Sequence, residues 1–172
     1  MIIPGLIIST VTFPGVMVHE FSHLLMCRLT NTKVHKVCYF RFGNPSGYVI
    51  HESPASAWRH LLIGIGPLII NTGIGVLLGM LIIQNVFNAD GLFIFFWIFL
   101  LWMAISIAMH SFPSTGDAKA IFRTIWSRKA SLLSRLIGTP LVFLIYLGAI
   151  GSFFWLDLVY GILVVVGIPY ML

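Results

Sequence analysis

Long apolar stretches alternate with short polar ones along this chain. Apolar residues dominate residues 2–29, 57–83, 92–109 and 136–172. A stretch of about 20 apolar residues is long enough to cross the hydrocarbon core of a bilayer as a helix. These stretches therefore predict membrane-spanning helices, and the polar stretches between them predict the connections.

The first apolar stretch contains an interruption of its own. Pro4 and the pair Pro14-Gly15 break the run, and a proline inside a helix removes a backbone donor and kinks the axis. We therefore expect the helix to restart near residue 14 and to be regular over residues 16–27. The stretch lacks a basic N-terminal region and a small-residue cleavage site, so it is expected to be a retained helix and not a cleaved signal.

The pattern changes between residues 30 and 56, where β-branched and aromatic residues are mixed with basic ones. The turn cluster Gly43-Asn44-Pro45-Ser46-Gly47 separates two such runs, which predicts a β-hairpin between the first two spans. Because an isolated hairpin is only marginally stable in water, this one is expected to lie against the helices or the membrane surface.

Residues 118–135 form a second basic region. Apolar residues recur there at helical spacing between Lys and Arg side chains, which predicts an amphipathic helix at the membrane surface before the fourth span. The apolar stretch 136–172 would be about 55 Å long as one helix, against a hydrocarbon core of about 30 Å. We therefore expect two helices joined near residues 151–157 and five spans in all, with four spans and a long tilted last helix as the alternative.

Composition and charge narrow the class of protein. The chain is 59% hydrophobic and only 9% charged, whereas a soluble domain carries about 25% charged residues. This predicts an all-α polytopic membrane protein, with residues 1–172 as one membrane domain and almost no room for a soluble one. The net charge of +5 is attributed to membrane topology and contact with anionic lipid. In a chain this apolar, such a charge does not indicate nucleic acid as a partner, so nucleic-acid binding is excluded.

The positions of the basic residues predict the orientation. All ten Lys and Arg residues fall within residues 28–59 or 119–135, and the positive-inside rule places both regions in the cytoplasm. The N-terminus is then outside and, with five spans, the C-terminus is inside.

The first span carries a motif with metal-binding chemistry. His19-Glu20-Phe21-Ser22-His23 reads H-E-x-x-H, and residues i and i+4 share one face of a helix, so both imidazoles can bind one metal ion. Ionisable side chains are costly inside a bilayer and usually serve a function there. The motif therefore predicts a site for one zinc ion with Glu20 as the proton-handling group, although iron or manganese also accepts such ligands.

A catalytic zinc needs a third protein ligand and an open position for water. Asp117 follows a break that contains Pro113 and Gly116, on the same predicted side of the membrane as the H-E-x-x-H motif. It is the preferred third ligand, and capping of the following helix is its alternative role. Asp90 and Asp157 are expected on the outer side, too far away.

Two further polar residues lie in or beside the predicted spans. Asn71 follows Gly66-Pro67 in the second span, and His110 ends the third. Asn71 is expected either to bond to a neighbouring helix or to hold the backbone of a substrate. His110 is expected to support the metal ligands, to stabilise an oxyanion of the substrate, or to be an interfacial histidine. Both are kept as candidate substrate-binding residues.

Taken together, these motifs resemble the site-2 protease family of intramembrane zinc metalloproteases. The resemblance covers residues 10–120 and rests on His19-Glu20-x-x-His23, on Gly66-Pro67-x-x-x-Asn71, on the break that ends at Asp117, and on the position of the hairpin. The chain departs from the family pattern in one extra residue before Asn71. Around Asp117 it also lacks the upstream asparagine, the second proline and the following glycine.

The resemblance implies a minimal, divergent member that hydrolyses a peptide bond in or near a transmembrane segment of a membrane protein or peptide. Zinc on His19, His23 and Asp117 would bind a water molecule that Glu20 deprotonates, and the hairpin would help to hold the substrate extended. The expected location is the plasma membrane of a prokaryote, with the site toward the cytoplasm and the bilayer as a partner.

Two other functions stay open at this stage. One is a zinc membrane peptidase that acts on cytosolic or lipid-anchored substrates. The other is a non-catalytic, metal-binding membrane scaffold. The oligomeric state is not indicated by any pattern in the sequence.

Overall fold

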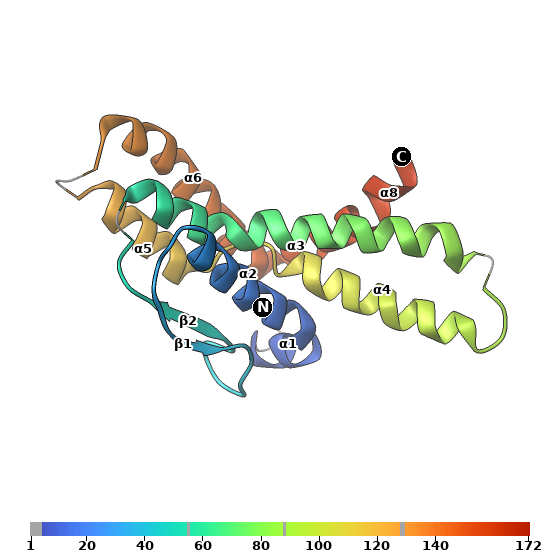
Figure 1. Ribbon diagram of the computed structural model, residues 1–172. Coiled ribbons are helices and arrows are strands. Elements are labelled where there is room, and N and C mark those ends of the chain that lie inside the picture. The colour runs from blue at the N-terminus through green and yellow to red at the C-terminus, as the bar shows by residue number, and fades with distance from the viewer. Residues whose placement is uncertain (1–4, 55, 88, 128–129) are drawn as a thin grey trace.

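Helices make up most of the computed structural model, which describes residues 5–54, 56–87, 89–127 and 130–172. A two-stranded antiparallel hairpin is the one sheet within these ranges (Figure 1). The elements are, in order, α1 (Gly5–Val11), α2 (Phe13–Leu29), β1 (Val34–Cys38), β2 (Tyr48–His51), α3 (Ala57–Val86), α4 (Phe93–Met109), α5 (Thr115–Ile125), α6 (Leu132–Gly151), the 3-10 turn η1 (Ser152–Phe154), α7 (Leu156–Ile162), the π-helical turn η2 (Leu163–Gly167) and α8 (Ile168–Met171).

The helix α3 is the axis of the molecule. Figure 1 shows it running the full length of the structure, with α4 along its C-terminal half and α5 and α6 beside its N-terminal half. Two buried apolar clusters correspond to these halves. The first joins α3 to α5 and α6 through Leu61, Ala118, Ile121, Ile125, Val142 and Ile145. The second joins α3 to α4 and η2 through Ile82, Leu100, Ala104, Ala108, Val164 and Val165.

Two helical stretches are long and apolar enough to cross a membrane. They are α3, with 30 residues, and Leu132–Phe154, with 23 residues. Within the described residues, Phe93–Met109 and Leu156–Met171 are shorter apolar helices. The second, third and fourth predicted apolar stretches are thus helical over most of their length.

The N-terminal region follows the prediction closely. The helix is interrupted at Thr12, between α1 and α2, and Pro14 lies in the first turn of α2. Proline is tolerated there because the first turn has no intrahelical acceptor for its missing N–H. The predicted restart near residue 14 is confirmed, and α2 extends beyond the predicted residues 16–27 by about one turn.

The predicted hairpin is also confirmed. β1 pairs with β2 antiparallel, with Val34 opposite His51 and Cys38 opposite Tyr48. In the turn cluster between the strands, the Arg41 N–H donates to the Ser46 carbonyl at 2.7 Å. The hairpin lies against α2 (Figure 1), as expected for a sheet too small to be stable alone.

The predicted amphipathic helix over residues 118–135 is wrong in its extent. Helix α5 begins at Thr115 and ends at Ile125, and the basic residues Arg128 and Lys129 lie outside the described residues. Ser131 then caps a new helix, because its hydroxyl accepts the Ser134 N–H at 3.2 Å. The end of the predicted range thus belongs to α6, since a serine before an apolar run is a strong helix start.

The predicted joint near residues 151–157 is confirmed, but its consequence differs from the expectation. Val142 of α6 packs in the cluster around Leu61, near the start of α3. After the joint, a Cβ added to Gly79, near the end of α3, would lie 2.2 Å from the Val165 carbonyl oxygen. The segment from α6 to α8 therefore follows α3 in one direction, in two consecutive pieces, and does not turn back as two separate spans would.

Candidate metal centre

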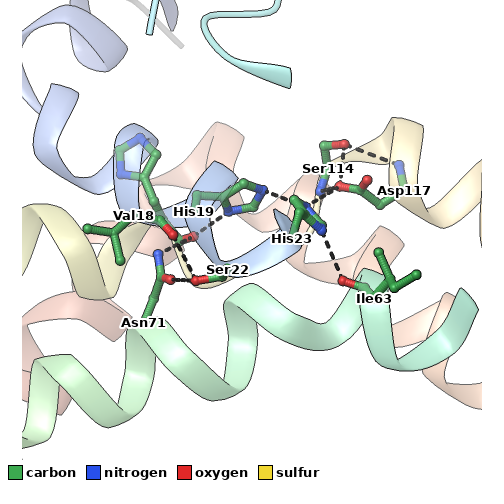
Figure 2. A network of polar contacts seen from close by, with 9 residues as sticks. Val18, His19, Ser22, His23, Ile63, Asn71, Ser114 and Asp117 are labelled. Carbon is green, nitrogen blue, oxygen red and sulfur yellow. Dashed lines mark hydrogen bonds and ion pairs between the residues drawn. The ribbon is translucent and has the colours of Figure 1, made fainter. Parts of the chain in front are cut away.

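Two imidazoles face one another on one side of α2. The Nε2 atoms of His19 and His23 lie 3.1 Å apart, as Figure 2 shows. Their spacing of four residues places them one helical turn apart on the same face. His23 is buried, with 6% of its surface exposed.

The other nitrogen of each ring is bound to the backbone of a neighbouring helix. His19 Nδ1 lies 2.7 Å from the His110 carbonyl oxygen, and His23 Nδ1 lies 2.9 Å from the Ile63 carbonyl oxygen. Because a carbonyl only accepts, each Nδ1 carries the proton and donates it. In the neutral rings, both Nε2 atoms are then acceptors with lone pairs that converge. A cation between them removes this repulsion, and backbone carbonyls commonly orient metal-binding histidines in this way.

Asp117 completes a group of three candidate ligands. Its Oδ2 lies 3.6 Å from His23 Nε2, and one ligand atom from each of His19, His23 and Asp117 lies within 4.8 Å of the others. Tetrahedral zinc with bonds of about 2.0–2.1 Å holds its ligand atoms about 3.3 Å apart. The three side chains could therefore hold a metal ion with small adjustments.

Ser114 is the N-cap of α5, and Asp117 is its capping-box partner at the third helical position. The expected N-cap role of Asp117 thus belongs to Ser114, and the Asp117 carboxylate supports that cap while it faces the two imidazoles. Its Oδ2 accepts the Ser114 N–H at 2.8 Å and the Ser114 hydroxyl at 2.7 Å, and the Asp117 N–H donates to Ser114 Oγ at 3.2 Å. Burial alone would raise the pKa of the Asp117 carboxyl. When the His23 ring takes up a proton, its hydrogen bond and charge, with the charge of His19 and the Ser114 hydrogen bond, instead hold that pKa well below its usual range. Asp117 is therefore a carboxylate, the form that binds a metal.

Asn71 supports the centre and does not contact the cavity. Its side chain is fully buried, and its Oδ1 accepts the Ser22 hydroxyl at 2.8 Å. Its Nδ2 donates to the carbonyl oxygens of Ile107 and His110, both at 3.2 Å. The amide thus ties α2, α3 and α4 together and uses both of its N–H groups. The structure shows the expected bond to a neighbouring helix and leaves no amide N–H for a substrate.

A second polar link between α2 and α4 could not be assigned from the sequence. Ser106 Oγ accepts the Gly15 N–H and donates to the Thr12 carbonyl oxygen, each at 2.9 Å. A Cβ on Gly15 would lie 1.9 Å from the Ser106 carbonyl oxygen and 2.6 Å from His110 Nδ1. A glycine at position 15 thus lets α2 reach α4. The signal in the sequence was a lone serine in an apolar stretch.

The candidate ligands line a cavity of about 490 Å³. Glu20 lies on the same wall, and the hairpin turn covers it, since Asn44 to Val49 also line the cavity. A Cβ added to Gly47 would lie 2.6 Å from Glu20 Cγ and 2.9 Å from its Oε1. The turn therefore rests on the Glu20 side chain through a residue without a side chain.

The remaining predicted residues divide between the cavity and the surface. His110 lines the cavity while its Nδ1 donates to the Ser106 carbonyl oxygen at 2.9 Å. Asp90 is exposed in the connection before α4. Asp157 lines the same cavity as His19, nearer to the centre than expected, but it is not part of the group that could hold a metal ion. The reason for this position is the path of α7, which reaches the end of α4 only near its own end, where Gly161 packs against Met109.

Comparisons with known protein families, curated proteins and solved structures find no match to this chain. The function is therefore argued from the chemistry of the site.

Proposed function

We propose that this chain is an intramembrane zinc metalloprotease that hydrolyses a peptide bond in or near a transmembrane segment of its substrate. One observation carries the proposal. The Nε2 atoms of His19 and His23 lie 3.1 Å apart with their Nδ1 protons donated elsewhere, and the Asp117 carboxylate joins them beside Glu20 in one cavity.

The donor set suits a catalytic zinc ion. Two imidazoles and one carboxylate leave a coordination position for solvent, unlike the four protein ligands of a structural zinc site. When bound there, zinc supplies Lewis-acid chemistry that polarises a carbonyl and activates water. The carbonyls of His110 and Ile63 hold the two imidazoles in the tautomer that this requires.

Glu20 is the proposed general base. It follows His19 directly, so its side chain leaves the same helix next to the ligands, and it lines the cavity. A carboxylate in this position takes a proton from the attacking water and passes it to the leaving amine. The hairpin turn over Glu20 limits the access of bulk water to this proton transfer.

The surface of the helices supports a membrane setting. Large apolar side chains are exposed over the first half of α4 and along α6, a pattern that would be costly in water and that the apolar interior of a bilayer accommodates. On α4 they are Phe93, Phe95, Phe96, Ile98 and Phe99, and on α6 they are Leu132, Leu133, Leu136, Ile137, Phe143, Leu144, Leu147 and Ile150.

The packing favours the four-span alternative, with a last span that is broken. The spans are α1 with α2, then α3, α4, and finally α6 to α8, which together follow α3 in one direction. Helix α5 lies between the last two spans at the membrane surface. The basic residues within residues 28–59 and in α5 support a cytoplasmic location for α5 and the hairpin, by the positive-inside rule.

The decisive experiment is cleavage of transmembrane peptides by the full-length protein in lipid vesicles, with the product termini mapped by mass spectrometry. We expect termini within the apolar stretch of the peptide, and we expect Glu20→Gln to retain zinc and to lose cleavage. The matched control is Glu52→Gln, because Glu52 is about half exposed. Undiminished cleavage by Glu20→Gln would refute the mechanism.

The same experiment separates the alternatives. Termini confined to soluble segments indicate a peptidase for cytosolic or lipid-anchored substrates. Stoichiometric zinc without cleavage of any probe indicates a non-catalytic metal-binding scaffold. Iron or manganese in place of zinc is read directly from metal analysis of the purified protein.

A further inference from the structure

Asp157 is the one charged residue within residues 136–172. It lies at the break in the C-terminal segment, where Trp155 adopts a left-handed backbone with φ of 63° and α7 begins at Leu156. The break turns this side chain toward the cavity that also contains the candidate metal centre. A carboxylate inside a membrane-spanning segment is costly unless it is paired, and ionisable groups in such segments usually serve a function.

Among the described residues, no cation pairs with Asp157. In the ion pairs that the described residues form, the acids are only Asp117 and Glu52. Asp157 Oδ1 accepts the Leu158 N–H at 2.9 Å. A neutral backbone N–H compensates only a small part of a carboxylate's lost hydration.

The polar neighbours of Asp157 on the cavity wall do not pair with it either. The Ser152 hydroxyl donates to the Gly148 carbonyl oxygen at 3.2 Å, and His110 Nδ1 donates to the Ser106 carbonyl oxygen at 2.9 Å. Both of these donors are thus turned to the backbone, and among the described residues no hydrogen bond or ion pair joins the His110 ring to Asp157. The carboxylate of Asp157 is left facing the cavity as an acceptor.

We propose that Asp157 is a specificity subsite that binds a lysine or arginine side chain of the substrate. The inference rests on the proposed function. One cavity holds both the metal centre and Asp157, so a single peptide can reach both. A substrate with a basic residue in an apolar stretch carries an unfavourable charge through the bilayer. Pairing with Asp157 relieves the cost of both charges, and this selects such segments over uniformly apolar ones.

A cationic side chain fits the position better than a second metal ion. Asp157 is not part of the group that could hold a metal, and one carboxylate with a histidine already engaged offers too few ligands. A lysine or arginine needs only the charge and the acceptor oxygens that Asp157 presents.

The test is binding of synthetic peptides to full-length, zinc-loaded protein in nanodiscs, in a Glu20→Gln background that leaves the peptides uncut. The peptides are apolar helices of 23 residues, made in pairs. The two members of a pair differ only in having lysine or norleucine at one position, and that position differs from pair to pair. We expect the best lysine peptide to bind at least about tenfold more tightly than its norleucine partner. Asp157→Asn should abolish this preference. Asp90→Asn, which changes an exposed acid, should leave it intact.

A charge reversal guards against a merely structural effect. Asp157→Lys should prefer a glutamate peptide to the lysine peptide. Equal binding of lysine and norleucine peptides by the parent, or an unchanged preference in Asp157→Asn, overturns the subsite. If Asp157→Asn does not fold, equal binding of the lysine and norleucine peptides by the parent still overturns the subsite, and Asp157→Lys still tests its position.

Failure of the subsite and failure of the proposed function are separable. The wild-type protein is given the same two peptides in the cleavage assay. Cleavage of both peptides at equal rates, with equal binding, overturns the subsite and leaves the protease intact. Selective binding of the lysine peptide without cleavage overturns the protease and leaves the subsite.

Discussion

Asn71 donates an amide hydrogen to the carbonyl oxygen of His110, at 3.2 Å. The same oxygen accepts the Nδ1 proton of His19 at 2.7 Å. A residue buried between three helices therefore shares one carbonyl acceptor with a candidate metal ligand (Figure 2). This arrangement fixes the position of the carbonyl, and the carbonyl fixes the ring.

Replacing Asn71 with alanine should weaken zinc binding. The His110 carbonyl would lose a donor, Ser22 would keep only the Val18 carbonyl as acceptor, and the His19 ring would be less well oriented. Loss of such outer partners typically costs about 10–100-fold in metal affinity. Competition with a chromogenic chelator measures the change. The control is Asn85→Ala at the exposed end of α3, where the amide donates only to Leu81, and an unchanged affinity in Asn71→Ala contradicts the role.

A methyl group at position 47 should reduce cleavage while zinc content stays the same. Alanine there would place its Cβ 2.6 Å from Glu20 Cγ, so either the turn or the Glu20 carboxylate must move. A displacement of about 1 Å at a reacting group can cost about 100-fold in rate. We expect at least a tenfold fall in the cleavage rate.

Gly43→Ala is the matched control for this change. Its nearest neighbours would be side-chain atoms of Arg41, the closest at 3.6 Å, which is ordinary contact. Equal rates for the two alanine variants would show that the turn does not position Glu20.

The two roles of Asp117 can be separated by substitution. Asp117→Asn keeps an oxygen that can accept from Ser114 but removes the charge, so it should lose most zinc affinity and retain the helix. Ser114→Ala removes the cap, which should lower the free energy of unfolding by about 1 kcal/mol and weaken zinc binding less. Metal analysis and thermal unfolding followed by circular dichroism give the two readouts. Full zinc occupancy in Asp117→Asn would eliminate Asp117 as a ligand.

Removal of the metal should both stop cleavage and destabilise the protein. The converging Nε2 atoms of His19 and His23 repel one another without a cation, and a ligand that binds only the folded state adds to its stability. Dialysis against a chelator should abolish cleavage and lower the melting temperature. One equivalent of zinc should restore both, whereas magnesium, which prefers oxygen ligands, should restore neither. Cleavage that persists in the metal-free protein would contradict the proposal.

The local features of this protein could be read from its sequence. The spacing of His19 and His23 puts two imidazoles on one face of any helix. The turn cluster at residues 43–47 predicts a hairpin whatever that hairpin packs against. Pro14 likewise indicated where α2 restarts. These features depend on residues a few positions apart, so local geometry is enough to determine them.

Other features depended on contacts between distant parts of the chain. The partners of His19 and His23 are carbonyl oxygens of His110 and Ile63, and every residue type supplies a carbonyl, so no side-chain pattern could indicate them. The direction of the C-terminal helices, and with it the place of Asp157, was set by packing along α3. Hydrophobicity indicates that a segment is buried or lies in lipid. Only the fit of side chains between helices decides which neighbouring helix the segment packs along.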